Sequence, residues 1–121
     1  MSFASPIVLK DAAAANENFI RLSGDKAQVT YALQTATLNA PVLLVIGHQM
    51  TSSPEGSDRH LVKISRTVIG TDSKPRTSVL NCTLSVPRST ISRTDVNNMI
   101  AELREFLLST ANVDALLRGE L

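Results

Sequence analysis

The chain has 121 residues, of which 43% are hydrophobic and 19% charged, and its formal net charge at pH 7 is +1. This length predicts a single globular domain, 1–121, and the longest apolar run, 41–47, is too short to cross a bilayer. The first residues lack the basic segment and long apolar stretch of a secretory signal. Cys82 is the only cysteine, which excludes an internal disulfide, and we expect it to be a small buried hydrophobe.

The first ninety residues contain a series of short segments with the composition and alternation of β-strands. The expected strands are 6–10, 17–23, 27–35, 42–53, 59–69 and 78–87. Short polar turns join these segments, and no helical pattern lies between them. The pattern therefore predicts an antiparallel multi-stranded sheet, formed by an N-terminal hairpin and a meander, with one buried face.

The last of these segments, SVLNCTLSVP at 78–87, alternates most regularly. Successive side chains of a strand point to opposite sides of the sheet. Its residues divide between an apolar side, Leu80, Cys82, Leu84 and Val86, and a small-polar side, Val79, Asn81, Thr83 and Ser85. Pro87 should end the strand because proline has no N–H to donate. Amide and hydroxyl groups are an unusual choice for a surface that only needs to be soluble, so the small-polar side is a candidate contact surface.

Beyond Pro87 the apolar spacing becomes helical, and six apolar residues fall within an arc of about 120° at 100° per residue. These residues are Val96, Met99, Ile100, Leu103, Phe106 and Leu107. Ser92 or Thr94 can cap this helix. A second, shorter helix is expected from a cap at Asn112 through Arg118, and Gly119 suits the left-handed residue that follows a helix. Its apolar side is formed by Val113, Leu116 and Leu117.

The predicted fold is therefore α+β, with a one-sided antiparallel sheet in 1–90 followed by two C-terminal helices in 91–121. A helix of about 14 residues is about 21 Å long and covers about two strands, so much of the sheet would stay bare. A second copy of the chain covers the rest most economically, with two sheets joined edge to edge and the helices of each lying over the other. A monomer with better-wrapped loops is the alternative.

Charge is distributed unevenly along the chain. Between Arg59 and Arg93 there are seven basic residues and one acid, Asp72, which gives this segment a charge of +6. The rest of the chain has five basic and ten acidic residues, a charge of −5. This asymmetry is typical of a surface that faces a polyanion, because neutralising phosphates supplies most nonspecific affinity for nucleic acids. A set of merely solvated strand residues is the alternative.

Sequence patterns of catalysis are missing. There is no glycine-rich phosphate loop and no nucleophile elbow, and no pair of carboxylates is placed for acid–base chemistry. His48 and His60 lie in separate strands, with no carboxylate or thiol at metal-ligand spacing. We expect each histidine to be an ordinary strand residue with a hydrogen bond. The chain is predicted not to be an enzyme and to use no metal ion, cofactor or small-molecule substrate.

The order of strands followed by two helices, the segments at 59–69 and 78–87 and the ending AELREFLLSTANVDALLRGEL resemble the coat proteins of small positive-strand RNA bacteriophages, the leviviruses. The resemblance implies interlocked homodimers that build an icosahedral shell, and a virion assembled in the cytoplasm of the bacterial host. It implies that the helices pack on the partner's sheet. The expected dimer-interface residues are Val96, Met99, Ile100, Leu103, Phe106, Leu107, Val113, Leu116 and Leu117.

The resemblance also implies that one sheet face binds a hairpin of single-stranded viral RNA, which represses replicase translation and marks the genome for packaging. The expected RNA-binding residues are Gln49, Thr51, Lys63, Ser65, Asn81 and Thr83. Val79 stands where well-studied members of the family have an aromatic residue that stacks on a base, so we expect hairpin recognition to differ in detail. The alternative is a cellular nucleic-acid-binding module that forms no shells.

Overall fold

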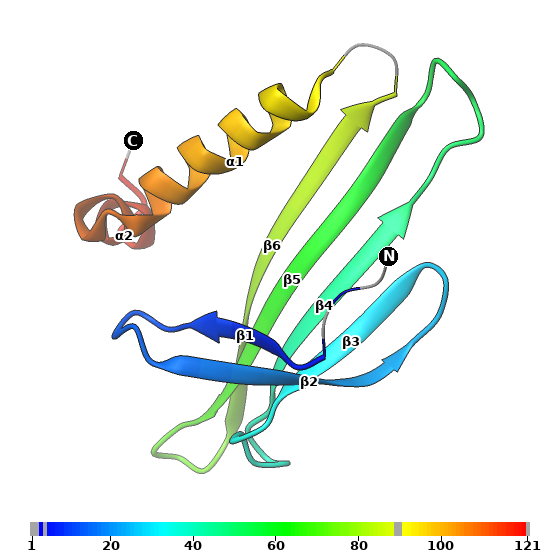
Figure 1. Cartoon of the computed structure of the whole chain (residues 1–121). Helices are drawn as coiled ribbons and strands as arrows, with labels where there is room; N and C mark the ends of the chain where they lie inside the picture. Colours follow the sequence, from blue (N-terminus) through cyan, green and yellow to red (C-terminus); the bar gives the residue numbers. More distant parts are fainter. Residues whose placement is uncertain (1–2, 4, 89–90, 121) are drawn as a thin grey trace. The chain divides into compact units, whose positions relative to one another are not determined.

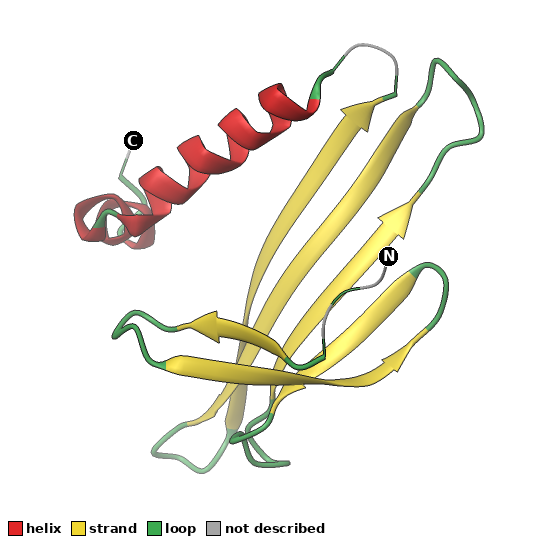
Figure 2. Cartoon of the chain, viewed as in Figure 1, coloured by secondary structure: helices red, strands yellow, loops and turns green. Residues whose placement is uncertain are grey.

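The computed structural model of the chain describes residues 3, 5–88 and 91–120. Six strands precede two helices (Figures 1 and 2). The elements are β1 (Ile7–Lys10), β2 (Asn16–Gly24), β3 (Gln28–Leu33), β4 (Val42–Gln49), β5 (Ser57–Ile69), β6 (Pro75–Pro87), α1 (Arg93–Leu108) and α2 (Thr110–Leu117). The chain divides into two compact units, Met1–Val86 with the sheet and Pro87–Leu121 with the helices.

The six strands form one sheet in the order β1-β2-β3-β4-β5-β6, so each strand pairs with its neighbour in the chain. The sheet curls, and β1 and β2 run at a steep angle to β5 and β6 (Figure 1). A bulge between Arg21 and Ser23 interrupts the pairing of β2 with β3 and adds to the local twist. This arrangement confirms the predicted α+β fold, in which an antiparallel hairpin and meander precede two helices.

One face of the sheet, which we call the core face, carries the hydrophobic core. Tyr31 lies opposite Leu44 in the pairing of β3 with β4, and Leu44 lies opposite Ile64 in the pairing of β4 with β5. Because side chains alternate along each strand, this register brings apolar side chains of neighbouring strands to the same side. The buried cluster consists of Phe19, Tyr31, Leu33, Val42, Leu44 and Ile46. It belongs mainly to β2, β3 and β4.

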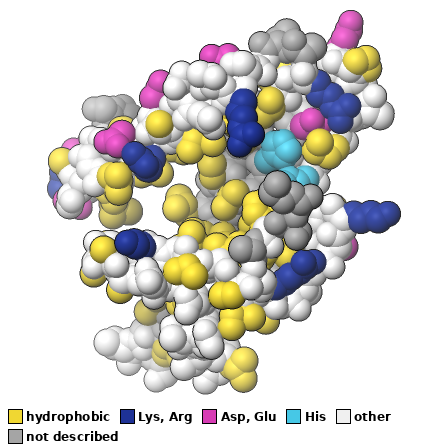
Figure 3. Space-filling model, viewed as in Figure 1, with side chains coloured by type: hydrophobic (Ala, Val, Ile, Leu, Met, Phe, Trp, Pro, Cys, Tyr) yellow, Lys and Arg dark blue, Asp and Glu magenta, His cyan; other side chains and the backbone are white. Residues whose placement is uncertain are grey.

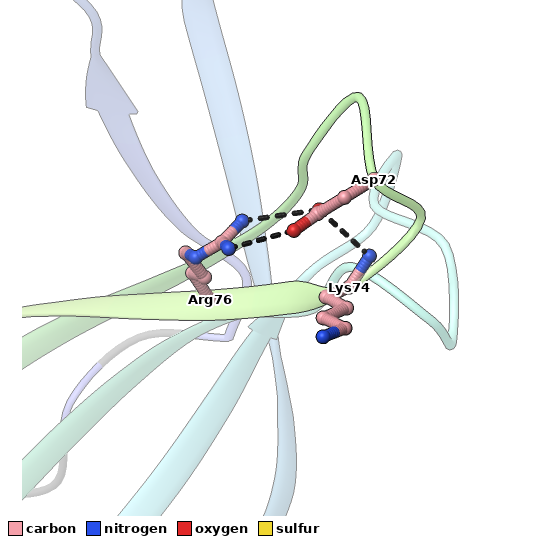
Figure 4. Close-up of polar contacts among 3 residues, drawn as sticks. All are labelled: Asp72, Lys74 and Arg76. Carbon is pink, nitrogen blue, oxygen red and sulfur yellow. Dashed lines mark hydrogen bonds and ion pairs between the residues drawn. The ribbon is translucent and has the colours of Figure 1, made fainter.

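Asp72 holds the hairpin that joins β5 to β6. Its carboxylate accepts hydrogen bonds from two guanidinium nitrogens of Arg76, at 3.2 and 2.7 Å, and from the Lys74 backbone N–H at 3.1 Å (Figure 4). Arg76 first, and then the Lys74 N–H, lower the pKa of this carboxyl group below its ordinary value. The turn therefore has an ionised carboxylate at its centre at neutral pH.

The helical unit begins with a capping box. The Ser92 hydroxyl accepts a hydrogen bond from the Asp95 N–H at 3.2 Å, and the Asp95 carboxylate accepts one from the Ser92 N–H at 3.4 Å, which confirms Ser92 as the cap. The predicted cap at Asn112 is wrong, because the cap lies three residues earlier at Ser109, whose hydroxyl accepts a hydrogen bond from the Asn112 N–H. Gly119 has a φ of +72°, the expected left-handed conformation.

Two further expectations are corrected. The strand predicted over 42–53 ends at Gln49, because the Thr51 N–H turns away to donate to the Asp58 carboxylate at 2.8 Å. Cys82 is exposed and not buried, because the burial of a strand residue depends on what covers that side of the sheet and not on the pattern of the strand itself. No helix in the described part of the chain combines the length and the apolar character that a membrane span requires.

Candidate nucleic-acid interface

The face opposite the core brings most of the predicted RNA-binding residues together. In the pairing of β4 with β5, Gln49 lies opposite Arg59 and Lys63 lies opposite Val45, all on the side away from the core. We call this side the polar face. Its polar residues on β3 to β6 are Gln28, Thr30, Gln49, Ser57, Arg59, Lys63, Ser65, Thr67, Thr77, Asn81, Thr83 and Ser85.

The β5–β6 register follows from contacts near the hairpin. The Gly70 N–H donates to the Lys74 carbonyl at 3.1 Å, and the hydroxyls of Thr67 and Thr77 meet at 2.8 Å. β5 and β6 are antiparallel, so a position four residues before Thr67 on β5 lies opposite a position four residues after Thr77 on β6. This register places Lys63 opposite Asn81. Lys63 and Asn81, which the resemblance to coat proteins implies are a basic and an amide contact, are therefore neighbours on the polar face.

Thr51 does not share this arrangement. It follows the end of β4, and its backbone N–H is held by Asp58. Gln49, at the end of the strand, and Thr51 still line one polar depression with Ser57 and Arg59. Thr51 is therefore at the margin of the polar face, whereas the other five predicted RNA-binding residues lie on its strands.

Acidic side chains are kept off the polar face. The six strands contain two acids, Glu17 and Asp58, and the strand registers place both on the core face. Glu17 lies 3.7 Å from the guanidinium group of Arg66 there. Among the described strand residues, the polar face therefore has amides, hydroxyls and cations but no carboxylate, so it does not repel phosphate groups.

The +6 segment does not form one continuous basic patch. Arg66 lies on the core face and pairs with Glu17, and Arg76 pairs with Asp72 in the hairpin. Arg59 and Lys63 lie on the polar face, and neither makes an ion pair with any residue that the structure describes. Of the seven basic residues of this segment, Arg59 and Lys63 are thus the two that lie on the polar face of a strand without an ion pair to a described residue.

A hollow of about 320 Å³ lies on the polar face around Gly47. Gly47 lies opposite Gln28 on one side and Leu61 on the other, and its missing side chain leaves the floor of the hollow open. A Cβ at this position would have its nearest neighbour 3.7 Å away, so a small side chain fits there without a clash. Gln49, Arg59 and Thr83 add polar groups to the lining.

Aromatic residues do not contribute to the polar face. In the described strands the two aromatic residues, Phe19 and Tyr31, are both buried on the core face. Val79 lies on the polar face and is 53% exposed. Any ligand of this face would therefore be held by hydrogen bonds and charge more than by stacking on aromatic rings.

The edge formed by β6 is a second candidate interface. β6 is the last strand of the sheet and has 13 residues, so it presents a long row of backbone groups that none of the described strands pairs with. Leu80, on its apolar side, is 58% exposed. Long, apolar and unprotected edges are sites at which another chain adds a strand.

The helices are equally uncovered, since neither α1 nor α2 has a buried residue. Of the nine predicted dimer-interface residues, Val96 and Val113 are partly buried. The exposed fractions of the other seven run from 38% at Leu107 to 80% at Leu117. Helices of this kind owe most of their stability to packing of an apolar stripe, so they require a surface to pack on.

Sequence reasoning missed three contributors to the polar face: Gln28, Gly47 and Arg59. Arg59 has the same parity as Lys63 on one strand, so alternation alone could have identified it. Gln28 and Gly47 come together only through the register of β3 with β4, which the sequence does not specify. No pattern in the sequence signals the hollow.

The fold of this chain is similar to that of several solved structures. The chain matches the solved "Virus-like particle of bacteriophage AVE019" with a TM-score of 0.80 at 9% identity, over 96% of this chain and 95% of the other. It matches "Virus-like particle of Wenzhou levi-like virus 1" with a TM-score of 0.68 at 17% identity, over 94% and 96%. It matches "Bacteriophage EMS014 coat protein" with a TM-score of 0.67 at 20% identity, over 85% of this chain and 72% of the other.

No family model and no curated protein matches the sequence itself. The likeness therefore lies in the backbone, and it extends over nearly the whole chain in structures that form virus-like particles. The curled six-stranded antiparallel sheet followed by two helices is the fold of levi-like bacteriophage coat proteins.

Proposed function

We propose that this chain is the coat protein of a levi-like RNA bacteriophage, which forms homodimers that assemble into an icosahedral shell around single-stranded RNA. The observation that carries the proposal is the pair of uncovered surfaces. A 13-residue edge strand with an exposed apolar side is followed by two helices that contain no buried residue. A chain that works alone would leave both surfaces in water.

In the proposed dimer, β6 of one protomer pairs with β6 of its partner, and the two sheets become one. This pairing supplies partners for the unpaired backbone groups of both edges. The helices of each protomer lie over the core face of the partner and bury the apolar side chains of β6 there, which are Leu80, Cys82 and Leu84. The nine apolar residues of α1 and α2 that the sequence singles out form the other side of this interface. Such an arrangement buries the apolar area that a single chain leaves exposed.

The polar face then becomes one continuous RNA-binding surface on the inside of the shell. Arg59 and Lys63 supply charge for phosphates, and Asn81 and Thr83 offer short donors and acceptors to bases and sugars. The hollow around Gly47 has polar groups at its rim that could hold a base turned out from a hairpin loop. Binding of such a hairpin would repress translation and mark the genome for packaging. The protein would then reside in the virion after assembly in the bacterial cytoplasm.

Electron microscopy of the purified recombinant chain tests this proposal. We expect closed shells tens of nanometres across that contain nuclease-protected RNA. A small soluble oligomer that binds RNA but forms no particle under any assembly condition would contradict the coat function and favour a cellular nucleic-acid-binding module. Shells that are empty of RNA would retain the capsid function and contradict the role of the polar face.

A further inference from the structure

Two histidines of neighbouring strands meet on the core face of the sheet. His48 in β4 lies directly opposite His60 in β5. Their Nδ1 atoms are 2.8 Å apart, and the two rings are arranged edge to face, with centroids 5.1 Å apart and an interplanar angle of 73°. The histidine side chains lie next to each other at the surface (Figure 3). They are the only two histidines in the chain.

The contact between two Nδ1 atoms defines the chemistry of the pair. One nitrogen must carry the proton and the other must accept it, so the lone-pair directions of both rings converge on the space between them. Nδ1 of a neutral imidazole is also a ligand for transition metals. We propose that His48 and His60 form a two-histidine binding site for a divalent transition-metal ion such as Zn²⁺, which binds both Nδ1 atoms while the proton between them moves to Nε2 of the ring that carried it.

The geometry needs only a small adjustment. With Zn–N distances of about 2.0–2.1 Å and tetrahedral angles, two ligand nitrogens lie about 3.3 Å apart. The rings therefore have to separate by about 0.5 Å, which a rotation about the side-chain bonds provides. In the single chain His48 is exposed and His60 is half-buried, so the ion can enter from solvent.

The remaining coordination positions belong to water. Among the described residues there is no group of three or more histidine, cysteine, aspartate or glutamate side chains that could enclose an ion. An open site with two imidazoles favours zinc, nickel and copper over magnesium and calcium, which prefer oxygen ligands. We therefore expect modest affinity together with clear selectivity.

The surroundings of His48 contain charges of both signs. Asp25, Arg21 and Lys26 line the same cavity as His48. The Asp25 carboxylate accepts hydrogen bonds from the N–H groups of Ala27 and Gln28, which lower its pKa. It therefore stays ionised at neutral pH and offsets part of the positive charge. The ring of Phe3 lies parallel to that of His48, at a centroid distance of 6.2 Å and an angle of 4°.

Titration of the untagged full-length protein with zinc sulfate, followed by calorimetry, tests the site. We expect one Zn²⁺ per chain, no binding of magnesium chloride, and at least about tenfold weaker zinc binding in both His48→Asn and His60→Asn, because each removes one of two ligands. Glu55→Gln, which neutralises a carboxylate in the turn between β4 and β5 outside this cavity, is the control and should retain zinc binding. No zinc binding at millimolar concentration, or equal binding by the wild type and both histidine variants, would overturn the proposal.

A second measurement needs no variant and so does not depend on how the variants fold. In nuclear magnetic resonance spectra of the wild-type chain, ring signals of both histidines should change together as zinc is added, because one ion contacts both rings. A change in only one ring, or in neither, would show that the ion is held elsewhere.

Discussion

The strands β2, β3 and β4 and the segment from β6 to α2 contain similar apolar residues but differ in what covers them. Phe19 and Tyr31 in the first region are 2% and 1% exposed, whereas Leu80 and Phe106 in the second are 58% and 48% exposed. The first region completes its core within one chain. The segment from β6 to α2 has the apolar composition of a core, but its apolar side chains are exposed. Exposed apolar surface of this kind is expected of a subunit interface before assembly.

The largest expected effect comes from breaking the completed core. Phe19→Ala should lower the free energy of unfolding by about 3–5 kcal/mol, because it removes a fully buried aromatic ring and leaves a cavity. Urea denaturation followed by circular dichroism measures this loss. A loss below about 1 kcal/mol, the range of ordinary surface substitutions, would show that the region does not depend on this cluster.

The same substitution at an exposed phenylalanine, Phe106→Ala in α1, tests whether the exposed apolar surface is an interface. In an isolated chain Phe106→Ala should cost little, since the ring is half exposed. If a partner covers it, the substitution should weaken dimerisation by about 2 kcal/mol, as expected for an aromatic residue at the centre of an interface. Sedimentation velocity over a dilution series measures the dimer dissociation constant.

Glu105→Ala is the matched control for Phe106→Ala. At 100° per residue, Glu105 points away from the apolar stripe of α1, and its carboxylate lies 3.4 Å from the guanidinium group of the adjacent Arg104. It should leave the dimer unchanged. Equal effects of the two variants would mean that the apolar stripe is not the interface.

The difference between these regions also shows how far the sequence could predict the molecule. Alternation and helical spacing were sufficient for the order of the strands and helices and for the two faces of β6, whereas the grouping of Lys63 with Asn81 came from the resemblance to coat proteins. They could not predict the exposure of Cys82, because burial depends on what covers a strand and not on the strand's own pattern. They also could not bring His48 to His60 or Gln28 to Gly47, because these pairs depend on strand register.

A smaller effect is expected on the polar face. Lys63→Ala should reduce the slope of log affinity for RNA against log salt by about one, because one phosphate contact is lost. Arg66→Ala is the control, since Arg66 lies three residues further along the same strand, on the core face, and pairs with Glu17. Filter binding of a hairpin RNA over a salt series measures both slopes. Identical slopes for the two variants would remove Lys63 from the RNA-binding surface.

The smallest effect concerns the β5–β6 hairpin. Arg76 and the Lys74 N–H lower the pKa of Asp72 in the folded chain, so its stabilising contribution is present at neutral pH and is lost as the pH falls through the folded value. Asp72→Asn should therefore be less stable than the wild type at neutral pH, and this difference should shrink in acid. Urea midpoints of both proteins from neutral pH down to about pH 3 test the sign. A difference that grows in acid would contradict the role of the ionised carboxylate.

Sedimentation velocity of Leu80→Asp beside Val79→Asp tests the central claim most directly, that a second copy covers the apolar side of β6. The two residues are adjacent and almost equally exposed in the single chain, at 58% and 53%, but they point to opposite faces. We predict that Leu80→Asp abolishes the dimer, because it places an unpaired carboxylate in the interface, and that Val79→Asp leaves it intact. Wild-type dimerisation by both variants would contradict the account.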